Sequence, residues 1–447
     1  GTGTLYHELF PGTYTFRMSY NYGTEEKQQD IGTPVIFQTA LVDLQFSGTI
    51  KHKVGGWPVY SGPTEMLPVS HGFAFTGCSY GRQVLWFTPT AGTLFEKSIV
   101  FLSFLDGGGN GLADGDFDYR IGYGPRTTIG TTDSSGLIVY AVDGIKTNVK
   151  FRVQYAGAAL EKQQNIATDS CVVFQTVPVT AVLNNSAGNP INSGVSFKYR
   201  YSFDTYHPFT SPMELLPVNT KVQVYYAGTS VENQQNVGTN ANFVFQTVPV
   251  TAVLNDSDGK PITSGVSFRY RYSYDPYQTF TSPMELLPVN TKVRVYYAGT
   301  SVENQQNVGT NANFVFQTVP VTAVLNDSDG KPITSGVSFR YRYSYDPYQT
   351  FTSPMELLPV NTKVRVYYAG TSVENQQNVG TNANFVFQTG NVVSDSGTCT
   401  YYRYGYNPYQ PFSNGMELLP VSTKFKFSDG TAETSYTIAA GIFNHIH

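Results

Sequence analysis

A glycine-rich stretch at residues 106–118 (DGGGNGLADGDFD) holds the residues of this chain that are best suited to chemistry. Closely spaced carboxylate and amide oxygens are the ligands that Ca²⁺ takes in proteins. The spacing differs from that of the calcium loop between two helices, and no helical pattern flanks the stretch. In the register of the repeat described below, it replaces an ordinary hairpin turn. Two interpretations therefore stand, a plain turn and a calcium site with the ligands Asp106, Asn110, Asp114, Asp116 and Asp118.

Other sequence features give no indication of catalysis. The chain contains none of the G-x-S-x-G, H-E-x-x-H, P-loop or C-x-x-C motifs. Cys78, Cys171 and Cys399 lie far apart, so we expect neither a disulfide framework nor a metal site from them. His445 and His447 could form a metal pair on one strand face, although a frayed terminus is the simpler explanation. We expect no enzyme activity, and no cofactor other than the calcium considered above.

The tripeptide Phe-Gln-Thr divides the chain into repeats. Residues 248–318 and 319–389 are identical, and 177–247 differs from them at 10 positions. The longer interval between Thr39 and Thr176 fits two diverged copies. We predict seven modules: a partial first module with only the second half of the repeat (1–39), two diverged modules (40–102 and 103–176), three repeat modules (177–247, 248–318 and 319–389) and a C-terminal capping module (390–447).

Each module has the pattern of a small β-sandwich. In the fifth module, residues 249–254 are apolar, 255–261 are turn formers, and 266–274 alternate so that Phe268, Tyr270, Tyr272 and Tyr274 would share one face. Turn signals every 8–12 residues predict a sandwich with Ig-like architecture. Because almost no linker separates the modules, we expect the last strand of one module to run directly into the first strand of the next.

Two stretches carry a resemblance to a known group of folds. LNDSDGKPITSGVSF (254–268) and MELLPVNTKVRVYYAG (284–299) resemble the prealbumin-like sandwiches, which include carboxypeptidase regulatory-like modules and the B-type repeats of Gram-positive collagen adhesins. The shared features are a Gly-x-Pro turn, Gly-Val-x-Phe at the start of a strand, and Leu-Pro before an alternating strand. The resemblance covers nearly the whole chain. It implies an all-β tandem array of about seven Ig-like or prealbumin-like β-sandwich modules of about 71 residues, and a structural or adhesive role, as in large secreted bacterial surface proteins.

One departure from these adhesin repeats concerns the isopeptide bond between Lys and Asn that they often contain. The first strands at 250–255 and 321–326 have no Lys. A Glu does recur in the Leu-Pro phrase of six modules. We expect it to be a structural carboxylate paired with Lys292 or Arg271, or with their counterparts, and the isopeptide bond is the alternative. The six residues are Glu8, Glu65, Glu214, Glu285, Glu356 and Glu417.

Recurring tyrosines and sequons are candidates for binding or modification. The tyrosines could pack in the core, contact a neighbouring module or stack on sugar rings. Three Asn-x-Ser sequons lie in the same turn of three modules and are candidates for glycosylation. The tyrosines are Tyr270, Tyr272, Tyr274, Tyr277, Tyr341, Tyr343, Tyr345 and Tyr348, and the sequon residues are Asn184, Asn255 and Asn326.

Composition narrows the function. Only 13% of residues are charged and the net charge is −4. This composition does not indicate binding to nucleic acid. The longest apolar run, 98–105, is far shorter than the ~20 residues of a helical membrane span. We therefore expect an extracellular or cell-surface location, with no nucleic acid partner and no membrane insertion. Because the last module ends in a distinct phrase, as capping repeats do, we expect residue 447 to be the true C-terminus.

The repeats favour a structural role, because two identical modules cannot each carry a unique site. We predict a subunit of a surface stalk, fibre or filament whose partners are copies of itself. It would assemble by head-to-tail strand addition at the partial first module or by lateral packing. One alternative is an adhesin or carbohydrate-binding surface protein with glycan partners. The other is an accessory region of a larger secreted enzyme.

Overall fold

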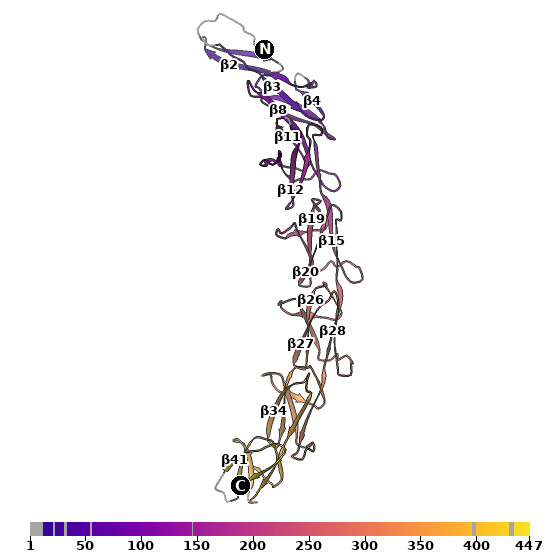
Figure 1. Ribbon diagram of the computed structural model, residues 1–447, viewed down its shortest axis with the longest axis vertical. Helices are drawn as coiled ribbons and strands as arrows, with labels where there is room; N and C mark the ends of the chain where they lie inside the picture. The colour runs from indigo at the N-terminus through magenta and orange to yellow at the C-terminus, as the bar shows by residue number, and fades with distance from the viewer. Residues whose placement is uncertain are drawn as a thin grey trace. The chain divides into compact units, whose positions relative to one another are not determined.

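A computed structural model of the protein describes residues 12–20, 23–30, 34–53, 56–144, 146–395, 399–428 and 433–447. In these residues the chain forms strands and turns and no helix (Figure 1). The structure thus confirms the predicted all-β fold of tandem sandwich modules. None of the described segments forms a helix that could span a membrane.

The fifth module shows the arrangement that the fourth, sixth and seventh modules share. A three-stranded sheet has the order β25-β22-β28, in which β22 is antiparallel to β25 and parallel to β28. A four-stranded antiparallel sheet has the order β24-β23-β26-β27. The strands are β22 (Val248–Asn255), β23 (Ser267–Arg271), β24 (Gln278–Phe280), β25 (Met284–Leu286), β26 (Asn290–Tyr297), β27 (Thr300–Asn307) and β28 (Asn313–Gln317).

The core lies between these two sheets because apolar residues alternate along the strands. Val293 and Val295 of β26 and Leu254 of β22 are fully buried, whereas Lys292 and Arg294 lie on the outer face. Tyr270 of β23 packs edge-to-face on Phe280 of β24, a preferred arrangement of aromatic rings. Aromatic area of this kind gives a domain of about 70 residues enough core to fold.

The fourth, sixth and seventh modules repeat the same seven strands. Those of the fourth are β15 (Val177–Asn184), β16 (Val195–Arg200), β17 (His207–Phe209), β18 (Met213–Leu215), β19 (Asn219–Tyr226), β20 (Thr229–Asn236) and β21 (Asn242–Gln246). Those of the sixth are β29 (Val319–Asn326), β30 (Ser338–Arg342), β31 (Gln349–Phe351), β32 (Met355–Leu357), β33 (Asn361–Tyr368), β34 (Thr371–Asn378) and β35 (Asn384–Gln388). Those of the seventh are β36 (Gly390–Ser394), β37 (Cys399–Tyr404), β38 (Gln410–Pro411), β39 (Met416–Leu418), β40 (Ser422–Phe427), β41 (Glu433–Thr437) and β42 (Phe443–Ile446).

The second and third modules share one long strand, β8 (Leu94–Leu105). Its first part, up to Ser98, runs parallel to β3, and its last part, from Phe101, runs parallel to β14. The module boundary placed at 102/103 from the sequence therefore falls inside β8. The other strands are β3 (Ala40–Gln45), β4 (Thr49–His52), β5 (Thr64–Met66), β6 (His71–Gly77), β7 (Tyr80–Phe87), β9 (Asp116–Arg120), β10 (Thr127–Thr131), β11 (Leu137–Asp143), β12 (Val149–Tyr155), β13 (Ala158–Gln164) and β14 (Cys171–Gln175).

A disulfide joins these two modules, and this corrects the expectation from cysteine spacing. Cys78, in the turn between β6 and β7, is bonded to Cys171 at the start of β14, with the two Cα atoms 5.4 Å apart. Spacing along the sequence could not predict the bond, because the two half-cystines are 93 residues apart and only sheet topology brings them together. Cys399 is free and buried.

In the first module, β1 (Thr13–Tyr20) and β2 (Gly23–Asp30) form a two-stranded antiparallel sheet. Residues 34–39 hold the same Phe-Gln-Thr phrase as β28 but form no strand, and the described part of the chain offers them no pairing strand. Glu8 lies outside the described residues.

Residue contacts divide the chain into two compact units. The first comprises residues 1–183, 195–224 and 232–245, and the second comprises 184–194, 225–231 and 246–447. Each junction between modules is short: a single residue, Thr318, separates β28 from β29 within the second unit. The direct run from strand to strand that the sequence predicts is therefore present.

The alternating tyrosine strand is shorter than the sequence predicts. β23 ends at Arg271, and Ser273 adopts a positive φ of 48°. The chain reverses there, and the amide of Asp275 donates a hydrogen bond to the carbonyl of Tyr272 (2.9 Å). Tyr274 is consequently exposed and does not share a face with Tyr270 and Tyr272, which are buried. A single residue with its φ in the left-handed region ends the alternation of side chains between the two faces of the strand.

Candidate functional site

The junction between modules is built by the phrase Met-Glu-Leu-Leu-Pro. In the sixth module, Leu357 belongs to its own core, whereas the next residue, Leu358, packs into the core of the fifth module. Leu419 of the seventh module likewise enters the core of the sixth. Leu358 and Leu419 are fully buried. The two leucines of the phrase thus tie successive cores together, because they serve different modules.

The Glu of the phrase bonds to the preceding module. Glu356 accepts hydrogen bonds from the hydroxyl of Thr318 and from Ser257 Oγ (2.6 Å). The Thr is the last residue of the Phe-Gln-Thr tripeptide and is buried at the ends of the third, fourth, fifth and sixth modules. The equivalent Glu–Thr pairs are Glu214–Thr176, Glu285–Thr247 and Glu417–Thr389. A half-buried carboxylate that accepts several hydrogen bonds makes a strong contact.

This arrangement corrects the predicted pairing of Glu285 with Lys292 or Arg271. Both cations instead form ion pairs with Glu303. The reason is topological: Glu285 lies on β25 of the three-stranded sheet, whereas Arg271 and Lys292 lie on β23 and β26 of the four-stranded sheet. Neighbouring positions in sequence are therefore on opposite layers of the sandwich.

The sequons contribute to the same junction. The Ser of each sequon donates to the Glu of the following module, as Ser186 does to Glu285 and Ser328 to Glu417 (2.7 Å). The sequon Asn ends the first strand of its module, where the Asn255 carbonyl accepts from the amide of Thr318 (2.9 Å). The recurrence of Ser in the sequon thus has a structural cause, whereas the contact of Asn255 is made by its backbone. Glycosylation of Asn184, Asn255 and Asn326, which are all half-buried, stays a prediction.

A tyrosine makes a second contact across each junction. The Tyr199 hydroxyl lies 3.1 Å from the carbonyl of Ala156, in the hairpin turn of the preceding module. The turn residue has a positive φ in every case, which turns its carbonyl outward. The equivalent pairs are Tyr270–Ala227, Tyr341–Ala298 and Tyr402–Ala369. Burial raises the pKa of these tyrosines, so the hydroxyl keeps its proton and can donate.

The proposed calcium ligands belong to separate structures. Asp106 Oδ1 accepts the backbone amide of Asn110 (2.8 Å), which closes the same turn that Asp256 closes in the fifth module (Lys260 amide, 2.8 Å). Asp116 accepts from the Thr131 hydroxyl. Asp114 adopts a positive φ of 64° in the turn that leads to β9. Within the described residues there is no group of three or more Asp, Glu, His or Cys side chains placed to hold a metal.

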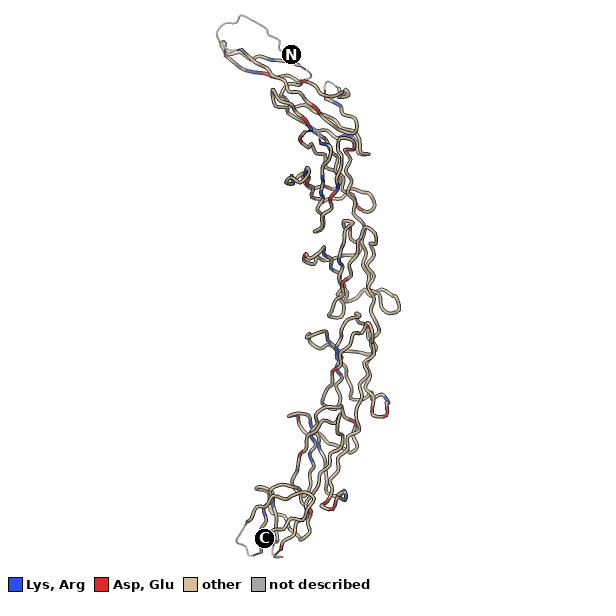
Figure 2. Tube along the Cα trace, viewed as in Figure 1, with Lys and Arg blue, Asp and Glu red and all other residues tan. Residues whose placement is uncertain are grey.

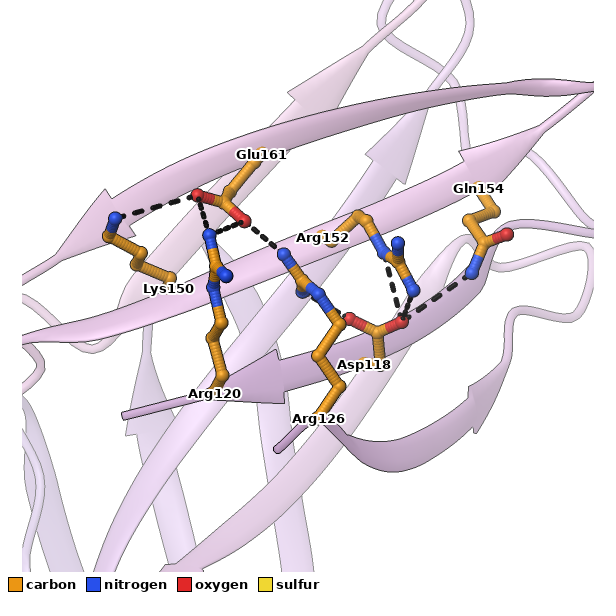
Figure 3. A network of polar contacts seen from close by, with 7 residues as sticks. All are labelled: Asp118, Arg120, Arg126, Lys150, Arg152, Gln154 and Glu161. Atoms are coloured by element: carbon orange, nitrogen blue, oxygen red, sulfur yellow. Dashed lines mark hydrogen bonds and ion pairs between the residues drawn. The ribbon is translucent and has the colours of Figure 1, made fainter. Parts of the chain in front are cut away.

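Asp118, the last of these residues, lies in a network on the outer face of a four-stranded sheet (Figure 3). It forms ion pairs with Arg126 and Arg152. Burial opposes its ionisation, but the hydrogen bonds and charges of these arginines hold its pKa below the usual range. Nearby, Glu161 pairs with Arg120, Arg126 and Lys150. The carboxylate of Asp118 is therefore paired with cationic side chains of its own module.

The same face carries a Glu-centred cluster in each following module. In the fifth, Glu303 of β27 faces Arg271, Lys292 and Arg294. The ring of Tyr277 lies between the two arginines, with guanidinium groups 4.5 and 4.2 Å from its centroid. Figure 2 colours the Lys and Arg positions of the described chain blue and the Asp and Glu positions red. The counterparts of Glu303 are Glu232, Glu374 and Glu433.

The structure assigns the candidate tyrosines to three environments. Tyr270, Tyr272, Tyr341 and Tyr343 are core residues. Tyr277 and Tyr348 are sandwiched between arginines on the outer face. Tyr274 and Tyr345 project from a turn and are almost fully exposed. The sequence treated these residues as one set because it does not show where the strand ends.

Comparison with known proteins finds only distant likenesses among solved structures. The chain matches no protein-family model and no curated protein. Among solved structures, the Bacillus anthracis TIE protein is 8% identical, with a TM-score of 0.19 over 70% of this chain and 75% of its own. A streptococcal ancillary pilin is 11% identical (TM-score 0.17, 63% of this chain and 98% of its own). The pilus adhesin SpaC of Lactobacillus rhamnosus GG is 9% identical (TM-score 0.16, 59% and 51%). At such scores the likeness carries no functional argument.

Proposed function

We propose that this chain is an extracellular structural repeat protein, a subunit of a surface stalk, fibre or filament whose partners are copies of itself. The observation that carries the proposal is the repeated junction, in which a Glu and a Tyr of one module bond to a Thr and a hairpin carbonyl of the module before it. Four junctions have both contacts. A chain that only displayed independent modules would not need them.

The order of strands within each module supports a mechanical role. The chain enters the fifth module along β22 and leaves along β28, and these two strands pair in parallel through five residue pairs. Tension along the chain would load this ladder in shear, because its two ends are pulled in opposite directions. All pairs would then have to break together rather than one after another. The same parallel pair exists in the sixth and seventh modules.

Head-to-tail strand addition is the assembly mode that we propose. Residues 34–39 carry the phrase that pairs with the first strand of a module elsewhere, and in the described residues they have no pairing strand. A strand from another copy would supply a parallel partner for these residues. Low surface charge would also permit lateral packing, because neighbouring chains would repel each other weakly.

Electron microscopy of native material, with antibodies against the chain, tests the function. We expect labelled filaments or stalks on the cell surface, and purified chain that associates as its concentration rises. A chain that stays strictly monomeric at high concentration and labels no surface structure would overturn the proposal. Addition of excess peptide with the sequence of β22 tests the assembly mode, because it should cap the first module and shorten the filaments. Unchanged filament length would exclude strand addition and leave lateral packing.

A further inference from the structure

Five modules display one aromatic ring each at the same position of the fold. The ring lies in the turn that follows the second strand, and it is between 89% and 99% exposed. Each ring has a lysine ammonium group 5.3–5.8 Å from its centroid. The pairs are Tyr123–Lys150, Phe203–Lys221, Tyr274–Lys292, Tyr345–Lys363 and Tyr406–Lys424. Two of these pairs lie in the first compact unit and three in the second.

The backbone that presents the ring is held in an unusual conformation. The residue before the ring has a positive φ, as in Ser202 (50°) and Ser273 (48°), whereas the third and seventh modules use Gly122 and Gly405. Side chains with a Cβ rarely adopt this conformation. A reversal at this point is what places the ring in solvent rather than in the core. Strain of this kind at a displayed side chain points to a function in binding.

The ring position stays aromatic although neighbouring residues differ between modules. The fifth and sixth modules are identical and count as one case. The residue that follows the ring changes from Gly124 to Asp204, Asp275 and Asn407, yet the ring position stays Tyr or Phe. Burial gives such an exposed position no reason to stay aromatic, because a ring in water gains nothing from burial.

The sheet face beside each ring carries net positive charge. In the fifth module the cations Arg269, Arg271, Lys292 and Arg294 are accompanied by the carboxylates of Glu303 and Asp275. In the seventh, Arg403, Lys424 and Lys426 are accompanied within the described residues by Glu433. This excess of cations contrasts with the net charge of −4 of the whole chain. The face therefore favours an anionic ligand, and it does so once per module.

We propose that these faces bind an acidic polysaccharide. The exposed ring would stack on the apolar face of a sugar, and the lysine beside it, with the neighbouring arginines, would pair with carboxylates on the polymer. The arginine and glutamate side chains of each cluster already hold one another in place. They would form hydrogen bonds with the hydroxyl groups of the sugar. Five weak sites along one chain and many identical units along one polymer give multivalent binding. This binding site goes beyond the proposed structural role and does not depend on filament formation.

Nucleic acid is the other polyanion that aromatic and basic residues could bind. It is disfavoured because the net charge of −4 gives the chain no basic footprint of the kind that nucleic-acid-binding proteins carry. A polyuronate carries one charge for each sugar and presents a face for stacking. The two classes can be compared in the same assay.

The test measures binding of the full chain to immobilised polygalacturonate. The chain is kept below the concentration at which it associates with itself. The matched polymer is its methyl ester, which has the same backbone without charge, and single-stranded poly(dT) is the control polyanion. We expect polygalacturonate to bind at least about tenfold more tightly than either control, with an affinity that falls as salt is added.

Two variants make the result specific. Replacement of all five rings by Ala (Tyr123, Phe203, Tyr274, Tyr345 and Tyr406) should lower the affinity for polygalacturonate by about tenfold or more without changing thermal stability, because the rings are exposed. The matched control replaces the exposed Val244, Val315 and Val386 of the three-stranded sheets by Ala and should bind as the parent does. Absence of binding, equal affinity for the ester or for poly(dT), or full affinity in the ring variant would each overturn the proposal.

Discussion

Thr389 ends the sixth module and Glu417 lies 28 residues further on in the seventh, yet the Thr389 hydroxyl donates a hydrogen bond to the Glu417 carboxylate. The same carboxylate accepts from Ser328 Oγ (2.7 Å) and the Ser328 amide (3.1 Å) in the turn of the sixth module, and from Asn391 (3.1 Å). One side chain thus joins three segments of the chain at a module junction.

Replacing Glu417 with Gln should loosen this junction. Gln keeps the shape but loses the charge and one acceptor, so we expect a loss of about 1–3 kcal/mol in the stability of the seventh module. Hydrogen exchange measures it: amides of the segment around Thr389 should exchange faster. The sequence departs from the repeat at Gly390, so peptides that span Thr389 and Gly390 can be assigned. The control is Asp329→Asn in the exposed turn. Equal protection in both variants would show that the carboxylate does not hold the junction.

The tyrosine contact can be tested with two neighbouring hydroxyl groups. Tyr199→Phe removes the group that reaches Ala156 and should cost about 1 kcal/mol. Tyr201→Phe removes a buried hydroxyl that has no hydrogen-bond partner among the described residues, and it should be neutral or stabilising. Thermal unfolding of the two variants gives the comparison. A Tyr201→Phe variant that is less stable than Tyr199→Phe would contradict the assignment of the junction contact.

The disulfide predicts a specific thiol count. In denaturant without reductant only one thiol, that of Cys399, should react with an alkylating agent, and three should react after reduction. Replacing Cys78 and Cys171 together with Ser should lower the free energy of unfolding of the second and third modules by about 2–4 kcal/mol, because the bond closes a long loop. Mass spectrometry and calorimetry check the two statements. Three reactive thiols before reduction would disprove the bond.

Two buried histidines make the second module sensitive to acid. His52 Nε2 lies 3.2 Å from His71 Nδ1, and the other ring nitrogen of His71 lies 2.9 Å from the Leu67 carbonyl. Burial, with a smaller contribution from the charge of His71, lowers the pKa of His52 to about 4, and burial also lowers the pKa of His71.

Below about pH 6.5 these histidines therefore bind protons in the unfolded chain that they do not bind in the folded chain. Stability should be constant above about pH 6.5 and should fall as the pH drops from about 6.5 towards 4, by about 3 kcal/mol at most for His52. His52→Phe, whose ring can stack on Phe73 as that of His52 does, should flatten this dependence. Unfolding of the second module at pH 7, 5.5 and 4.5 measures it. An unchanged slope in the variant would mean that other groups cause the acid sensitivity.

Much of the fold follows from sequence alone. The exact repeat sets the number and length of the later modules, and alternation in Asn290–Tyr297 predicts which face of β26 is buried. Gly259 and its neighbours predict the turn after β22, where the positive φ of 83° requires glycine. These features depend on residues that are close in sequence, so local rules of side-chain periodicity and turn chemistry determine them.

Tertiary structure decided the partners of the functional residues. Glu356 is bonded to Ser257, 99 residues away, and Cys78 to Cys171. The first and last strands of a module pair in parallel, which brings segments distant in sequence next to the adjoining module. The exposure of Tyr274 depends on one backbone dihedral at Ser273, which the alternating pattern conceals. The sequence determined the modules by itself, because strands and turns are local. Only the packing of sheets and junctions decided which side chains hold the modules together and which face solvent, because those contacts join residues that are distant along the chain.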